Sequence, residues 1–106
     1  MHYTEFEFTL PKGLVDPEGE IHRQGTMRLA TGKDAISVQR NRRVIEEPEY
    51  GVLVILSRVI TSLGNFSSVS PELLEQLFLV DFVYLQEFLG HLNGEFYASG
   101  ELSATP

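Results

Sequence analysis

The chain has 106 residues and a formal net charge of −7, with fifteen acidic and eight basic side chains. This length suits one small domain with a modest core. Cysteine is absent, which excludes disulfides, thiolate metal sites and cysteine nucleophiles.

The charges are unevenly distributed along the chain. All eight basic residues lie at or before Arg58, and the six charged side chains beyond it are acidic. We therefore expect no nucleic-acid partner for the C-terminal half. No window approaches the about 18 apolar residues of a membrane span, so we expect no membrane partner. The first ten residues lack the basic and apolar regions of a secretory signal, which predicts a cytoplasmic protein.

The N-terminal third predicts an antiparallel β-hairpin. Residues 4–10 alternate between apolar and polar side chains, as half-buried strands do. Asp16-Pro17-Glu18-Gly19 predicts a tight turn, and alternation returns afterwards. We place the strands at about residues 3–10 and 21–29, ended by Pro11-Lys12-Gly13 and by Thr31-Gly32. A lone hairpin is marginally stable, so its apolar face should pack on helices.

A short, polar region follows the hairpin. Gly25, inside the second strand, predicts a bulge or a close approach of two backbones. Residues 33–39 predict a short helix or turn that starts near Thr31 or Gly32. Residues 40–47 hold arginines followed by glutamates and no aromatic residue, which favours a solvated loop over a nucleic-acid patch.

Two apolar helices are predicted next. The first begins at Pro48 and keeps helical spacing to Leu63, just before Gly64. Its β-branched run at 52–56 also suits a buried strand, but the length of the pattern favours a helix. The second spans residues 70–93, and a short connection between the two predicts an antiparallel helical hairpin.

The 70–93 segment contains signals for both of its ends. Ser70 is a typical cap, Pro71 suits the first helical position, and Asn93-Gly94 is a typical stop. We therefore predict an α+β fold with one domain at 1–94, comprising the β-hairpin at 3–30 and a helical part at 33–94. A flexible tail is expected at 95–106.

The long helix has a wide apolar stripe with Asp81 at its centre. An unpaired buried carboxylate is costly, so several roles are open for Asp81. It could pair with Arg58 or Arg28, lie at the wet edge of the stripe, orient the helical hairpin, or lie at a protein interface where a partner supplies the cation. The stripe is longer than the other predicted elements can cover, which predicts a homodimer or higher oligomer. The candidate interface residues are Leu74, Phe78, Asp81, Leu85, Phe88, Leu89 and Leu92.

Chemistry-bearing motifs are missing from the sequence. His2, His22 and His91 fall on different predicted elements without metal-ligand spacing. The glycines are singly placed turn residues and form no phosphate-binding loop. We therefore assign no catalytic, cofactor-binding or metal-binding residues and expect a protein that is not an enzyme.

The order of these features resembles the small tail assembly chaperones of Mu-like phages and of phage-tail-like contractile particles. The resemblance covers most of residues 4–93, through degenerate motifs. Its segments are Phe6-Glu7-Phe8-Thr9-Leu10-Pro11, Gly25-Thr26-Met27-Arg28-Leu29-Ala30, Asp34, the stretch 53–64 (LVILSRVITSLG), Leu77-Phe78, and Asp81-Phe82-Val83-Tyr84-Leu85-Gln86.

The resemblance implies a cytoplasmic, non-catalytic helper in the bacterial host cell. Such chaperones bind the tape-measure protein, prevent its apolar helices from aggregating, help to recruit tail-tube subunits and are left out of the finished particle. Two other interpretations stay open at this point. The protein could be a structural tail or baseplate subunit that remains in the particle, or an unrelated small protein-interaction adaptor domain.

Overall fold

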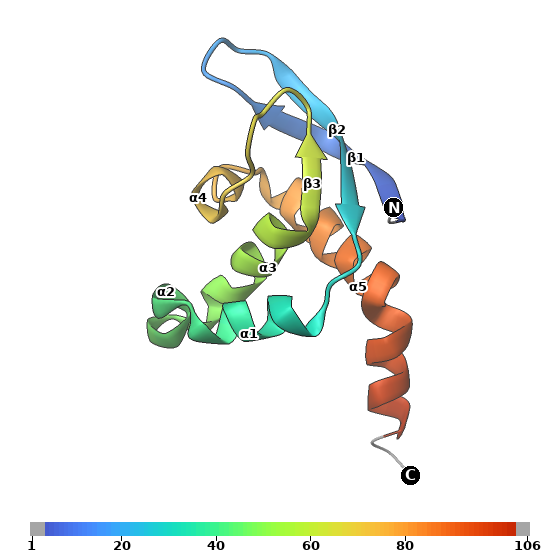
Figure 1. Ribbon diagram of the computed structural model, residues 1–106. Helices are drawn as coiled ribbons and strands as arrows, with labels where there is room; N and C mark the ends of the chain where they lie inside the picture. The colour runs from blue at the N-terminus through green and yellow to red at the C-terminus, as the bar shows by residue number, and fades with distance from the viewer. Residues whose placement is uncertain (1–3, 104–106) are drawn as a thin grey trace.

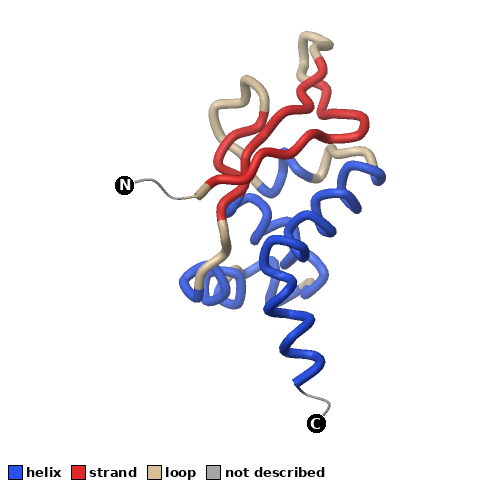
Figure 2. Tube along the Cα trace, turned by 90° about the vertical axis from the view of Figure 1, so that its right-hand side faces the viewer, coloured by secondary structure: helices blue, strands red, loops and turns tan. Residues whose placement is uncertain are grey.

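A computed structural model describes residues 4–103, with side chains for 4–94. The chain forms a three-stranded antiparallel sheet in the order β1-β2-β3, and helices cover one of its faces (Figures 1 and 2). This arrangement confirms the predicted α+β fold. The boundaries of several elements differ from those predicted.

The predicted hairpin is present, but its first strand is longer than expected. Strand β1 (Glu5–Val15) pairs with β2 (Ile21–Arg28). The predicted turn between them is confirmed by the Gly19 N–H, which donates to the Asp16 carbonyl at 2.9 Å. Pro11-Lys12-Gly13 does not end β1; the register instead shifts between Thr9 and Leu14, so the strand bulges there and continues.

The third strand was not predicted. β3 (Ile60–Leu63) pairs antiparallel with β2 and occupies the end of what was expected to be a helix. Gly25 lies at this crowded crossing, where a Cβ would come within 2.4 Å of the Phe8 ring and 2.6 Å of the Ser62 carbonyl oxygen. The close approach predicted at Gly25 is therefore confirmed.

The middle of the chain is mostly helical. α1 (Gly32–Arg40) begins with a capping box, in which Thr31 and Asp34 each accept a backbone N–H from the other. The charge-rich segment, predicted as a loop, contains the short helix α2 (Arg42–Glu46). A 3₁₀ turn, η1 (Pro48–Tyr50), then leads into α3 (Gly51–Val59).

The predicted long helix is divided in two. α4 (Pro71–Leu74) starts as expected, with the Ser70 side chain accepting the Leu73 N–H and Pro71 in the first turn. The chain then turns through residues 75–78, and α5 (Leu79–Ser103) follows in a new direction (Figure 1). Helix α5 continues past Asn93-Gly94, so the predicted stop is wrong. Flexibility of the tail stays a prediction, and residues 104–106 lie outside the described part.

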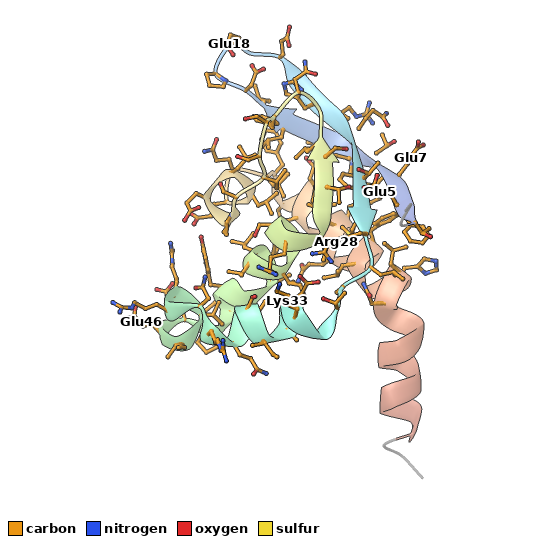
Figure 3. The ribbon with its side chains drawn as sticks, viewed as in Figure 1. Glu5, Glu7, Glu18, Arg28, Lys33 and Glu46 are labelled. Atoms are coloured by element: carbon orange, nitrogen blue, oxygen red, sulfur yellow. The ribbon has the colours of Figure 1, made fainter. Side chains whose placement is uncertain are left out.

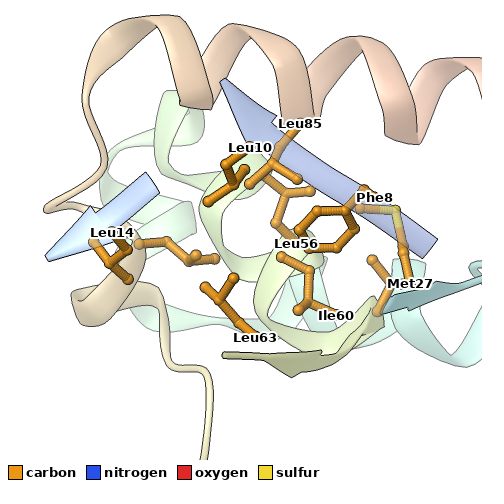
Figure 4. Packing of buried hydrophobic residues seen from close by; sticks show 10 residues of the cluster. Phe8, Leu10, Leu14, Met27, Leu56, Ile60, Leu63 and Leu85 are labelled. Carbon is orange, nitrogen blue, oxygen red and sulfur yellow. The ribbon is translucent and has the colours of Figure 1, made fainter. Parts of the chain in front are cut away.

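The core lies between the sheet and the helices. Phe8 and Leu10 of β1 and Met27 of β2 meet Leu56 of α3 and Leu85 of α5 (Figure 4). The apolar face of the hairpin thus packs on helices, as its marginal stability requires.

Candidate protein-binding surface

The start of helix α5 exposes a group of large apolar side chains. Phe78, Leu79, Val80 and Val83 have exposed fractions of 51%, 74%, 45% and 42%. We call these four residues the α5 ridge. Single exposed apolar residues are common on protein surfaces, but a contiguous group is typical of an interaction site.

The ridge faces outward because Asp81 is held inside. The Asp81 carboxylate is fully buried and accepts the backbone N–H groups of Lys12 at 2.8 Å and Gly13 at 2.9 Å. One turn further along, the Tyr84 hydroxyl oxygen accepts the Thr9 N–H at 3.3 Å. These bonds fix α5 against the bulged part of β1 and fix its rotation.

A groove lies on each side of Leu79. One groove runs toward β1, and the other runs toward α3 and α4. The first is lined by Pro11, Leu79, Val80, Val83, Tyr84 and Glu87. The second is lined by Arg43, Tyr50, Leu53, Leu74, Glu75, Leu77, Leu79 and Phe82. Leu79 therefore separates two largely apolar grooves.

The second groove has an ordered polar rim. The Tyr50 hydroxyl donates to Glu75 at 2.8 Å, and the Arg43 guanidinium stacks over the Tyr50 ring at 4.0 Å. Arg43 also lies 3.5 Å from Glu75. Burial, reinforced by the Glu75 carboxylate, raises the pKa of Tyr50 to about 12. Tyr50 therefore stays a neutral hydrogen-bond donor that holds Glu75 at the rim.

The charges around the ridge are mainly acidic. Glu72, Glu75 and Glu87 are exposed on α4, the following turn and α5. Two cations lie nearby: Arg43 lines the second groove, and the Lys12 Nζ lies 5.8 Å from the centre of the Phe78 ring. A partner with apolar side chains flanked by basic ones would complement this surface.

The structure places most of the predicted interface residues in the core. Leu74, Asp81 and Leu85 are buried, and Phe88, Leu89 and Leu92 are partly buried against the core. Phe78 is the exposed member of the predicted set. The predicted contact face is therefore largely buried inside the protein itself. The signal for the exposed face was Asp81, because its burial turns Leu79, Val80 and Val83 outward.

The predicted ion pair of Asp81 is also wrong. Arg28 and Arg58 both bind Asp34, the buried first-turn acid of α1. Arg28 forms a bidentate pair at 2.8 and 2.9 Å, and the Arg58 Nε donates at 2.8 Å. The Arg28 guanidinium, with further help from Thr31 and Arg58, holds the pKa of Asp34 far below its usual 3.8. Asp81 instead satisfies its charge with backbone N–H groups.

One cluster has the composition of a metal site. Ligand atoms of Asp16, Glu20 and His22 lie within 4.8 Å of one another. However, the His22 Nδ1 accepts the Asn65 N–H at 3.3 Å, which places the ring proton on Nε2. Nε2 then donates to Asp16 at 2.8 Å and lowers the pKa of that carboxyl. These hydrogen bonds account for Asp16 and His22 as a structural pair that closes the hairpin.

No helix in residues 4–103 combines the length and apolar character needed to cross a bilayer. Comparison of the chain with protein-family models, curated proteins and solved structures gives no significant match.

Proposed function

We propose that this protein is a tail assembly chaperone of a phage or phage-tail-like contractile particle, and that the α5 ridge binds an amphipathic helix of the tape-measure protein. The observation that supports this best is the exposure of Phe78, Leu79, Val80 and Val83 between two apolar grooves. The resemblance described from the sequence supplies the identity of the partner.

A helix suits the shape of this surface. Leu79 separates the two grooves, so apolar side chains at i and i+3 or i+4 of a partner helix can enter both. The exposed Glu72, Glu75 and Glu87 favour a partner whose apolar stripe has basic flanks. The net charge of −7 would keep the complex soluble while the partner's apolar surface is covered.

In this proposal the protein is non-catalytic and acts in the bacterial cytoplasm. It holds the tape-measure protein until tail-tube subunits assemble around it, and it is left out of the finished particle. The cost of leaving large apolar helices exposed to water gives the physical reason for such a helper.

Co-expression with the tape-measure protein tests the proposal. The wild-type chain should raise the soluble fraction of that protein, and the double variant Leu79→Gln with Val83→Gln should lose this effect. Ile45→Gln is a matched control, because Ile45 is 67% exposed on α2 and lines neither groove. Equal performance of the ridge variant and the control would contradict the proposed surface.

Analysis of purified particles separates the chaperone from a structural subunit. The chaperone proposal predicts that mass spectrometry of finished particles finds no stoichiometric amount of this chain. Its presence at tail-subunit levels would instead identify a structural tail or baseplate component.

A further inference from the structure

The groups around Asp34 form a second surface of a different kind. A hollow of about 600 Å³ is lined by Thr4, Arg28, Leu29, Thr31, Lys33, Asp34 and Arg58. Its lining holds three cations and one carboxylate, so it is locally positive in a chain of net charge −7. Figure 3 labels Arg28 near the end of β2 and Lys33 near the start of α1.

The two arginines have different roles at this hollow. Arg28 uses both of its Nη atoms on protein acceptors: Asp34, the Leu29 carbonyl and the Arg58 carbonyl. Arg58 donates to Asp34 through its Nε. Within the described residues its two Nη groups make no hydrogen bond, so they can bind another acceptor. Arg28 is thus structural, and Arg58 is a guanidinium held in place with its outer edge available.

The position of Arg58 is fixed before any ligand binds. Asp34 is 1% exposed and is itself held by Arg28, Thr31 and the start of α1. A guanidinium fixed in this way loses little side-chain entropy when it binds a planar oxyanion with both Nη groups. Lys33 adds an exposed ammonium at the N-terminus of α1, where the helix dipole also favours an anion.

An apolar hollow adjoins the positive one. It is lined by Ala30, Thr31, Gly32, Ala35, Ile55, Leu89 and Asn93, and it shares Thr31 with the hollow around Arg58. A ligand that spans both needs a carboxylate next to an apolar side chain. A nucleic acid or another free polyanion fits less well, because it has no such apolar group and is repelled by the net negative charge.

We infer that Arg58 and Lys33 bind a carboxylate of a partner protein segment, while the hollow between Ala35, Ile55 and Leu89 receives the apolar side chain beside that carboxylate. The site lies at the Thr4 end of β1, whereas the ridge adjoins Pro11. The two hollows of this site share no lining residue with the two grooves beside Leu79. The inference is therefore independent of the function proposed for the ridge.

Small acyl amino acids test this inference by titration into ¹⁵N-labelled protein. N-acetyl-leucine presents a terminal carboxylate, and N-acetyl-leucyl-glutamate amide presents a side-chain carboxylate. At least one should shift the amide signals of Gly32 and Lys33 and the Nε signal of Arg58. N-acetyl-leucinamide, which lacks a carboxylate, should bind at least about tenfold more weakly, as expected for the loss of a charge-assisted bidentate pair. The probe that binds more tightly shows whether the partner's carboxylate is a chain terminus or a side chain.

Substitutions of the two cations complete the test. Arg58→Lys keeps the positive charge but removes the pair of Nη donors. It should weaken binding of the carboxylate probe about tenfold. Lys33→Gln should weaken it about threefold, within the range of exposed ion pairs. Lys12→Gln is the matched control, because it removes the chain's other lysine, at the ridge. Thermal melts should show that each variant folds.

Three results would overturn the inference. The first is equal binding of N-acetyl-leucinamide and the carboxylate probes. The second is an equal effect of Lys33→Gln and Lys12→Gln. The third is tighter binding of inorganic phosphate than of either carboxylate at the same signals, which would assign the site to a phosphate ligand.

Discussion

The Asp81 carboxylate accepts the backbone N–H of Gly13 at 2.9 Å, across 68 residues of sequence. The neighbouring Lys12 N–H donates to the other carboxylate oxygen at 2.8 Å. Asp81 also lies in the first turn of α5, where the helix dipole stabilises a negative charge. A fully buried carboxylate is thus accommodated without a cation, and it joins the start of α5 to the bulge of β1.

Replacing Asp81 with Asn should destabilise the protein by about 2–4 kcal/mol, because the amide NH₂ group would face one of the two backbone donors. Urea unfolding followed by circular dichroism measures this change. Glu87→Gln removes an exposed acid from the same helix and should alter the free energy of unfolding by less than about 0.5 kcal/mol. Equal effects of the two substitutions would show that the bonds to Lys12 and Gly13 contribute nothing.

Double-mutant cycles distinguish the observed pairing from the one expected from the sequence. Asp81→Asn and Arg58→Gln should be additive within about 0.5 kcal/mol, since the two side chains bind different partners. Asp34→Asn and Arg58→Gln should instead show a coupling of about 0.5–3 kcal/mol. Coupling between Asp81 and Arg58, together with additivity between Asp34 and Arg58, would instead support an Asp81–Arg58 bridge.

Acid should destabilise the protein through Asp34. The pKa of Asp34 is held far below its usual 3.8 by Arg28, so the unfolded state takes up this proton at a higher pH than the folded state. The stabilisation is fully present above about pH 5 and is lost as the pH falls through 4 toward the folded pKa. Urea midpoints measured between pH 6 and pH 2.5 should fall steeply for the wild type.

The Asp34→Asn variant provides the comparison for this acid effect. It should start less stable and lose less stability on acidification. A residual slope of the same sign is expected from Asp16, whose pKa is lowered by its hydrogen bond with His22. Identical slopes for the wild type and Asp34→Asn would contradict the assignment to Asp34.

Self-association is predicted through the ridge. The apolar stripe that predicts an oligomer from the sequence is mostly buried. The exposed Leu79 and its neighbours now give the reason, so the isolated chain should sediment as a dimer or larger species at tens of micromolar. Leu79→Gln should shift it to a monomer with the same thermal stability. A compact monomer at every concentration, without binding of an apolar dye, would refute this.

The sequence predicted the elements whose signals are local. Alternation located the hairpin, although β1 extends beyond Leu10 and β2 ends one residue earlier than expected. Ser70 marked one helix start as its cap, and Thr31-Gly32 marked the region of another, because a helix start depends on a few neighbouring residues. The α+β class followed from these local patterns.

The misplaced elements depend on contacts distant in sequence. Ile60 and Leu63 continue the apolar spacing of α3, and pairing with β2 makes their segment a strand. Residues 75–78 contain neither Gly nor Pro, yet the helix breaks there. The break lets Leu74 pack in the core while Asp81 reaches β1. The partner of Asp81 was missed because backbone donors cannot be recognised from side-chain types.

The bonds to Asp81 also determine which substitutions β1 tolerates. Because the donors at residues 12 and 13 are main-chain groups, any side chain except proline at position 12 preserves the contact. Position 13 is restricted differently: Gly13 has a φ of 105°, and a Cβ there would come within 2.6 Å of Ile21. Homologous sequences should therefore retain Asp81 and Gly13 together and vary freely at residue 12, so this pair is a marker for recognising distant relatives of the fold.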